Sequence, residues 1–294
     1  MVILIKNLKI TNIMGTFKAA HKGCILFAVA LVIPNIYVQY FKWNFLLKLV
    51  KPEATARESL FSLLVGFTFG FITPGRVGEF GRAFFIKDCP WVKVMGVAFI
   101  DKFFSLAIVI FAGAVGLLSL IWSQLHFFVL LPLTVFTLIV LLLLRHLIIH
   151  PEIFRGFLYN INIILPFREK IKLLISSFDH FKKKQALKLL GLSILFYLIF
   201  FTQYFVLASA FEPVSVFGSF QAISSTLIVK SMLPISLGDL GIRESAAVFF
   251  FGKIGVKSAT AFNASILLFM INVLIPSLIG LVLVLKNRLI SLFN

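Results

Sequence analysis

Two short segments combine proline, glycine, a carboxylate and arginine, and their residue types are the ones most able to do chemistry. PGRVGEFGR covers residues 74–82, and PISLGDLGIR covers residues 234–243, 160 positions later. Both read proline, three residues, glycine, acid, any residue, glycine, and then arginine within two residues. This repetition indicates an internal duplication. The matched positions are Pro74, Gly78, Glu79, Gly81 and Arg82 in the first segment, and Pro234, Gly238, Asp239, Gly241 and Arg243 in the second.

The prolines and glycines of both segments predict breaks in helices. Proline lacks an amide donor and clashes with the preceding turn, whereas glycine tolerates left-handed or tightly packed backbone. Backbone freed from helix bonding at membrane depth must line a polar cavity or be buried in protein. The charges favour a cavity, and the alternative is a pair of polar surface loops with ordinary ion pairs. The predicted break residues are Pro74, Gly75, Gly78, Gly81, Pro234, Gly238 and Gly241.

The excess of arginine in the breaks indicates a site for a phosphate group. Guanidinium groups bind phosphate bidentately, and free amides at helix N-termini point toward anions. We expect Glu79 to pair with Arg82, and Arg243 to pair with Asp239 or Glu244, which leaves Arg76 without a nearby acid. Further charges could extend the cavity, or could be interfacial or snorkelling side chains. The candidate substrate-binding residues are Arg76, Glu79, Arg82, Asp101, Lys102, Lys230, Asp239, Arg243 and Glu244.

The elements that must position these residues are membrane helices. The chain is 60% hydrophobic and 13% charged, and its mean hydropathy is +1.06. A span needs roughly 20 apolar residues. We predict an all-α polytopic membrane protein with about five full spans and two broken or re-entrant hairpins, whose first halves are the short runs 59–72 and 217–233. The predicted spans lie near 24–44, 94–122, 127–149, 187–211 and 261–285.

The distribution of charge predicts the topology. Residues 150–188 are the most basic segment, which places them in the cytoplasm of a multi-pass cell-membrane protein. They form either a helix on the anionic inner leaflet or a solvated connector. The two breaks would then be reached from opposite sides and form an inverted repeat. The lysines before residue 23 oppose this scheme unless the N-terminal helix is interfacial or the chain crosses the membrane once more. The net charge of +17 reflects topology rather than nucleic-acid binding.

Catalytic and metal-binding motifs are missing from the sequence. It contains no HExxH, GxSxG, P-loop or CxxC pattern, and its two cysteines lie far apart. We therefore assign no catalytic residue, metal or cofactor, and favour transport over catalysis. One alternative is a membrane transferase acting on a phospholipid or polyprenyl phosphate, with Glu79 or Asp239 as general base. Another is a non-catalytic partner of such an enzyme.

At these motifs the sequence resembles the flippase-like family named the lysylphosphatidylglycerol synthase transmembrane region. The resemblance rests on TPGRVGEFGRAF, FIDKFFSL and LPISLGDLGIRESAA, and covers most of residues 30–285. It implies a lipid translocator, which in two-domain relatives moves an aminoacylated phospholipid made by a synthase domain that this sequence lacks. Two departures are visible: Asp239 stands where a second glycine is usual, and Asp101 with Lys102 where glutamate with arginine is usual.

These observations predict one membrane domain over residues 1–294, with repeat halves 24–149 and 150–294. We expect a lipid flippase that moves a phosphate-bearing phospholipid or polyprenyl-phosphate lipid. Arg76, Arg82 and Arg243 would hold the headgroup, while the neighbouring carboxylates orient them or meet a cationic part of it. The expected partners are membrane lipids with an anionic headgroup and a separate lipid-modifying enzyme.

Overall fold

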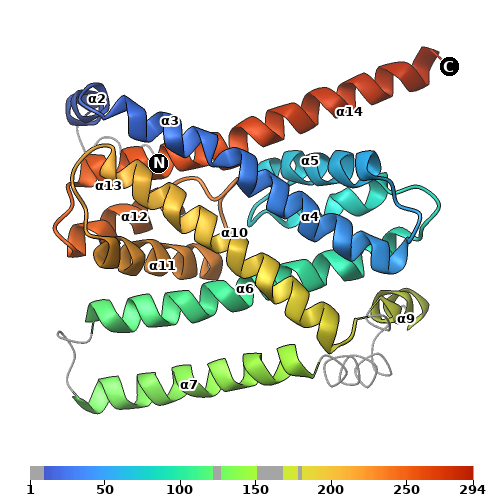
Figure 1. The fold of residues 1–294 in the computed structure, drawn as a ribbon, viewed down its shortest axis with the longest axis horizontal. Coiled ribbons are helices and arrows are strands. Elements are labelled where there is room, and N and C mark those ends of the chain that lie inside the picture. Colours follow the sequence, from blue (N-terminus) through green and yellow to red (C-terminus); the bar gives the residue numbers. More distant parts are fainter. Residues whose placement is uncertain (1–9, 122–126, 151–167, 178–180, 294) are drawn as a thin grey trace.

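The computed structural model describes residues 10–121, 127–150, 168–177 and 181–293, and within these ranges the chain is helical with no strand (Figure 1). This confirms the predicted all-α membrane fold. The elements are α2 (Ile10–Lys18), α3 (Lys22–Ala30), α4 (Val32–Val50), α5 (Ala56–Ile72), the 3-10 helix η1 (Val77–Phe85), α6 (Trp91–Ile121), α7 (Phe127–Ile149), α9 (Arg168–Ser176), α10 (Lys183–Ser209), α11 (Val216–Met232), α12 (Ile242–Lys253), α13 (Ser258–Phe269), the π-helical turn η2 (Met270–Leu274) and α14 (Ile275–Phe293).

Four stretches in the described part of the chain are long and apolar enough to cross a membrane. They match four of the five predicted spans and extend some of them, because α3 continues into α4 and α13 continues through η2 into α14. The fifth predicted span coincides with α7, in which Thr134–Leu143 is a shorter apolar helix among the residues searched. The four spans are Lys22–Val50, Trp91–Leu120, Lys183–Ser209 and Ser258–Lys286.

Helices α5 and α11 are the two predicted half-helices. Each has 17 residues, which is about 26 Å of helix against a hydrocarbon core of about 30 Å. Both begin at a capping hydroxyl, since the side chains of Thr55 and Ser215 accept hydrogen bonds from backbone amides of the first turn. Both end two residues before a proline, Pro74 or Pro234, where the helix cannot continue.

The two half-helices approach the centre of the molecule from opposite ends. In Figure 1, α4 runs toward the right end and α10 crosses it toward the left end. Helix α5 starts where α4 ends, α11 starts where α10 ends, and both finish near the middle. The inverted repeat and the internal duplication both stay predictions.

Each half-helix packs into its own hydrophobic core. The first core gathers side chains from α4, α5, η1 and α6 around Trp43, and the second gathers α10, α11, α12 and α13 around Tyr204 and Phe251; all three of these side chains are fully buried. The indole Nε1 of Trp43 donates to Ser62 Oγ on α5 at 2.8 Å. Helices α6 and α10 contribute side chains to both cores, so the two half-helices are held in one continuous helical body.

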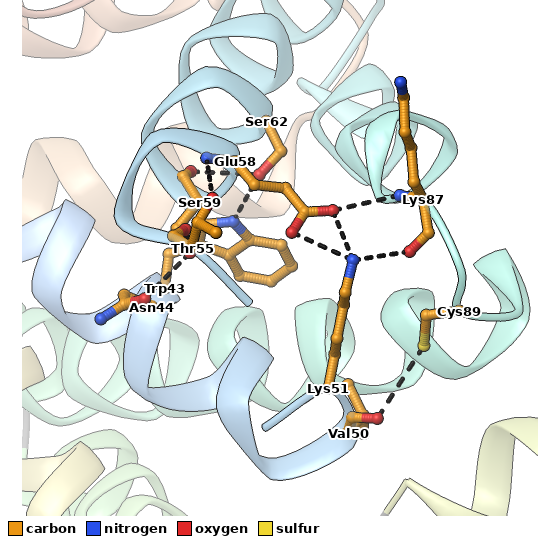
Figure 2. A network of polar contacts seen from close by, with 10 residues as sticks. All are labelled: Trp43, Asn44, Val50, Lys51, Thr55, Glu58, Ser59, Ser62, Lys87 and Cys89. Atoms are coloured by element: carbon orange, nitrogen blue, oxygen red, sulfur yellow. Dashed lines mark hydrogen bonds and ion pairs between the residues drawn. The ribbon is translucent and has the colours of Figure 1, made fainter. Parts of the chain in front are cut away.

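A polar network fixes the first hairpin at its outer end (Figure 2). Lys51 Nζ, just after α4, donates to Glu58 Oε1 on α5 and to the Lys87 carbonyl, both at 2.8 Å. The Lys87 amide donates back to Glu58 Oε1 at 3.1 Å. The hydrogen bond with Glu58 is the largest cause that raises the pKa of Lys51 above its usual value. The network therefore ties α4, the start of α5 and the segment after η1 together.

The segments at the two ends of the helical body also pack against it. Asn263 Nδ2 on α13 donates to the Ile13 carbonyl of α2 at 3.0 Å. Ser177 Oγ, directly after α9, donates to the Lys93 carbonyl of α6 at 2.7 Å, and Ile175 is fully buried. The basic segment 150–188 is thus partly anchored on α6, while its residues 151–167 and 178–180 lie outside the described part.

Candidate functional site

The two breaks contact each other at the centre of the fold. The Gly75 amide donates to the Ser236 carbonyl at 3.3 Å, and Pro74 forms an isolated antiparallel bridge with Leu237. A Cβ placed on Gly75 would lie 2.5 Å from Pro234 Cβ. The structure therefore brings together two segments that are 160 residues apart in the sequence.

The backbone of the two breaks differs despite their matching sequences. In the first break, Gly75 and Arg76 have φ angles of 60° and 59°, and the 3-10 helix η1 then encloses Gly78 and Gly81. In the second break the positive φ angles fall later, at Gly238, Asp239 and Gly241, before α12 begins. The shared motif therefore fixes where each helix stops rather than the conformation of the turn.

A small-residue face on α5 lets η1 approach closely. A Cβ on Gly70 would lie 2.5 Å from Glu79 Cγ, and one on Gly78 would lie 2.2 Å from the Phe69 carbonyl oxygen. A Cβ on Gly66 would lie 3.3 Å from Arg82 Cβ, a looser contact. The glycine spacing in the sequence thus serves to press the charged residues of η1 against α5.

A cavity of about 420 Å³ lies beside the contact between the breaks. Much of its apolar lining is aromatic and includes Phe99, Phe103 and Leu106 from α6 and Phe196, Tyr197 and Phe200 from α10. Among the described residues, the lining also includes five cationic and three acidic residues, a net charge of +2. These charged residues are Lys42, Arg76, Glu79, Arg82, Asp101, Lys102, Lys230 and Asp239.

Two carboxylates, one from each break, form ion pairs with the more exposed cations of the cavity. Glu79 pairs with Arg76 at 2.5 Å and also with Lys102. Asp239 pairs with Lys230 at 2.9 Å. The expectation that Arg76 lacks an acid partner is therefore wrong. The left-handed turn at Gly75 and Arg76 folds the Arg76 side chain back toward η1, where Glu79 lies.

A third carboxylate forms a buried triad with cations from two other elements. Asp101 on α6 contacts Lys42 Nζ at 2.8 Å and Arg82 Nη2 at 3.0 Å. The Arg82 guanidinium lies 3.6 Å from the Trp43 ring centroid. The expected pair of Glu79 with Arg82 is thus replaced by Arg82 with Asp101, because η1 packs between α5 and α6 and turns Arg82 toward α4 and α6.

Lys42 is a charged residue of the cavity that the sequence interpretation missed. It lies inside the predicted span 24–44, where a lysine is costly and is usually paired or functional. Its Nζ also donates to Ser105 Oγ at 3.0 Å and Ser193 Oγ at 3.3 Å. A lysine inside an apolar run was the available signal.

Arg243 and Glu244 lie outside the cavity lining. Arg243 Nη2 donates to Glu244 Oε1 at 2.5 Å, and Nε donates to Ser265 Oγ at 3.2 Å. Glu244 Oε2 accepts from the Gly241 amide at 2.6 Å. Both side chains are buried, so the pair anchors the second break to α13 instead of facing the cavity.

Comparison with known proteins adds a family to this geometry. The family model described as the lysylphosphatidylglycerol synthase TM region matches residues 1–280. That family is a membrane domain of lipid-related proteins, some of them flippase-like. Neither a curated protein nor a solved structure shows significant similarity to the chain. With its broken half-helices, its charged central cavity and a match over nearly its whole length, the chain belongs to the lysylphosphatidylglycerol synthase TM region family.

Proposed function

We propose that the protein translocates a phosphate-bearing lipid across the membrane and binds the lipid's headgroup in the central cavity. One observation carries this proposal: the lining of one cavity combines charged side chains, some of them from both breaks, with many aromatic side chains, most of them from α6 and α10. A lipid is amphipathic in the same way, because a polar headgroup continues into apolar chains. The cavity thus has the surfaces that a headgroup and the adjoining part of an acyl chain require.

The position of the breaks supports transport rather than simple binding. Half-helices α5 and α11 run toward the centre of the molecule from opposite ends (Figure 1), and the breaks that follow them contact each other and line the cavity. In transporters with broken helices, the site lies near the midplane, and the two halves rock to expose it to one side and then the other. Small movements at the contact between Gly75 and Ser236 would open the cavity toward one leaflet or the other.

The cations that line the cavity can bind a phosphate group. Arginine and lysine side chains bind phosphate oxygens strongly, and water exclusion strengthens each such contact. In this proposal Arg76, Lys102 and Lys230 serve the headgroup. Arg243 and Glu244, which the sequence assigned to the same task, instead fix the second break.

Proteoliposomes test the proposal. Purified protein is reconstituted with a lipid that carries a fluorescent label on one acyl chain and a phosphodiester headgroup. A membrane-impermeant quencher removes the fluorescence of lipid in the outer leaflet, so the further loss of fluorescence measures the movement of lipid from the inner leaflet to the outer one. We expect faster exchange than in protein-free vesicles, and slower exchange with the Arg76→Ala, Lys230→Ala double variant. Lys257→Ala is the matched control, because its side chain is 82% exposed and does not line the cavity.

Two results would contradict the proposal. One is exchange no faster than in empty vesicles; the other is unchanged exchange by the double variant. Mass spectrometry of the recovered lipid separates transport from the transferase alternative, because transport leaves the lipid's mass unaltered.

A further inference from the structure

We infer that the cavity selects headgroups of net negative charge over headgroups that carry an ammonium group, and that Arg76, Lys102 and Lys230 are the cations that contact the phosphate. This inference rests on the proposed function, because it names the lipid class that the same cavity accepts. It follows from which charges the fold has already paired and which still have donors facing the cavity.

The two most buried cations of the cavity, Lys42 and Arg82, already contact other residues of the protein. Lys42 Nζ has three N–H donors, and its three contacts are Asp101 Oδ1, Ser105 Oγ and Ser193 Oγ. Arg82 contacts Asp101 and covers the Trp43 ring. Their side chains are only 5% and 3% exposed. These cations neutralise Asp101 and hold α4, η1 and α6 together, so they have little left for a ligand.

The other three cations keep donors for a ligand. The side chains of Arg76 and Lys230 are each 21% exposed, and that of Lys102 is 40% exposed. Arg76 reaches Glu79 through Nε, so its two Nη groups are bonded to no described residue. Each lysine contacts one carboxylate, which uses one of its three N–H groups. The first break, α6 and α11 thus each contribute one cation with unused donors.

The carboxylates of the cavity, in contrast, are already paired. Asp101 has two cationic partners, Glu79 has two, and Asp239 has Lys230. An incoming ammonium group would have to displace one of these cations from a carboxylate that is at most 12% exposed. Removing a partner from a buried pair is costly because it leaves a charge without compensation. The cations of the cavity therefore attract a phosphate, whereas its three carboxylates are already paired and do not favour binding of an amine.

Asp239 sets how strong this preference is. Its φ angle is 63°, a left-handed conformation in which aspartate is tolerated but glycine is favoured. Its carboxylate neutralises Lys230, so the residue limits the positive charge of the cavity. The Asp239→Gly variant would suit the backbone and leave Lys230 unpaired. We expect that variant to bind anionic lipid more tightly than the natural protein does.

The test measures lipid binding to the purified full chain in detergent by native mass spectrometry. The probes share acyl chains and a phosphodiester: phosphatidylglycerol, phosphatidylethanolamine and lysylphosphatidylglycerol. We expect phosphatidylglycerol to bind about tenfold more tightly than the two lipids with an ammonium group. The Lys102→Met and Lys230→Met variants should lose most of this difference, Lys230→Arg should keep it, and Lys257→Met should leave it unchanged. Melting temperatures verify that each variant folds.

A water-soluble probe distinguishes a lipid headgroup from free phosphate. If glycerol 3-phosphate competes with phosphatidylglycerol only weakly, the apolar lining of the cavity contributes to the affinity and the ligand is a lipid. Equal binding of glycerol 3-phosphate and phosphatidylglycerol would overturn the lipid assignment. Equal affinity for the three lipids, or an unchanged preference in both the Lys102→Met and the Lys230→Met variants, would overturn the charge selectivity.

The outcomes also separate this inference from the proposed function. Selective binding without lipid exchange in proteoliposomes would remove transport and keep the anion-selective cavity. Equal exchange of all three lipids at a rate above that of empty vesicles would keep transport and remove the selectivity.

Discussion

Replacing Gly75 with alanine should destabilise the contact on which the whole site depends. Gly75 has a φ angle of 60° and packs directly on the second break. A Cβ there would lie 2.5 Å from Pro234 Cβ and 2.9 Å from the Pro234 carbonyl oxygen. Because those atoms belong to a proline ring and its backbone, they cannot move aside as a flexible side chain would.

The size of the effect follows from two separate costs. A left-handed conformation costs a residue with a Cβ about 1–2 kcal/mol, and overpacking a tight contact costs about 1–3 kcal/mol. The expected loss is therefore about 2–5 kcal/mol. Gly191→Ala is the matched control, because Gly191 lies inside α10 with no atom within 4 Å of the added Cβ. There alanine should be neutral or stabilise by up to about 1 kcal/mol.

Thermal unfolding of both purified variants in one detergent gives the comparison. We expect the melting temperature of Gly75→Ala to fall by at least about 4 °C, and its lipid exchange in proteoliposomes to fall with it. Gly191→Ala should melt at or slightly above the temperature of the natural protein. If Gly75→Ala melts and transports as the natural protein does, the two breaks do not pack as described.

Two further predictions concern charges outside the cavity. Arg243→Lys should lower stability by about 1–3 kcal/mol, because lysine cannot reproduce the contacts to Glu244 and Ser265. The affinity for phosphatidylglycerol should stay unchanged. A large loss of affinity with an unchanged melting temperature would instead place Arg243 in the binding site. Lys51→Met should melt lower than the natural protein at neutral pH. Since the folded pKa of Lys51 is raised above 10.5 by Glu58, this difference should persist below that pH and disappear as the pH rises through the folded pKa; disappearance already near about pH 8 would contradict the role of this contact.

Much of the architecture could be predicted from the sequence, because the rules involved are local or compositional. Long apolar runs dictate membrane helices, and prolines followed by glycines, as at Pro74 and Pro234, favour the end of a helix. The two half-helices, the segments that break, and the family therefore followed from residue order alone. The glycines at 66, 70 and 78 also indicated the close packing that η1 makes on α5.

The partners of the charges could not be predicted in the same way. Sequence proximity favoured Glu79 with Arg82 and left Arg76 alone, but an acid and a base a few residues apart can meet or diverge according to one turn of backbone. The left-handed Arg76 and the placement of η1 against α5 and α6 decided these pairs. Lys42 entered the site only because α4 packs on α6, which brings it to Asp101.

The sequence by itself determined where the chain is helical, where it breaks, and that arginine and carboxylates occupy both breaks. Only the tertiary structure decided that the breaks contact each other, that Arg243 and Glu244 lie behind the cavity wall, and which cations keep unused donors. The physical reason is range: helix formation and helix termination depend on neighbouring residues, whereas an ion pair depends on side-chain directions set by the packing of elements distant in the sequence.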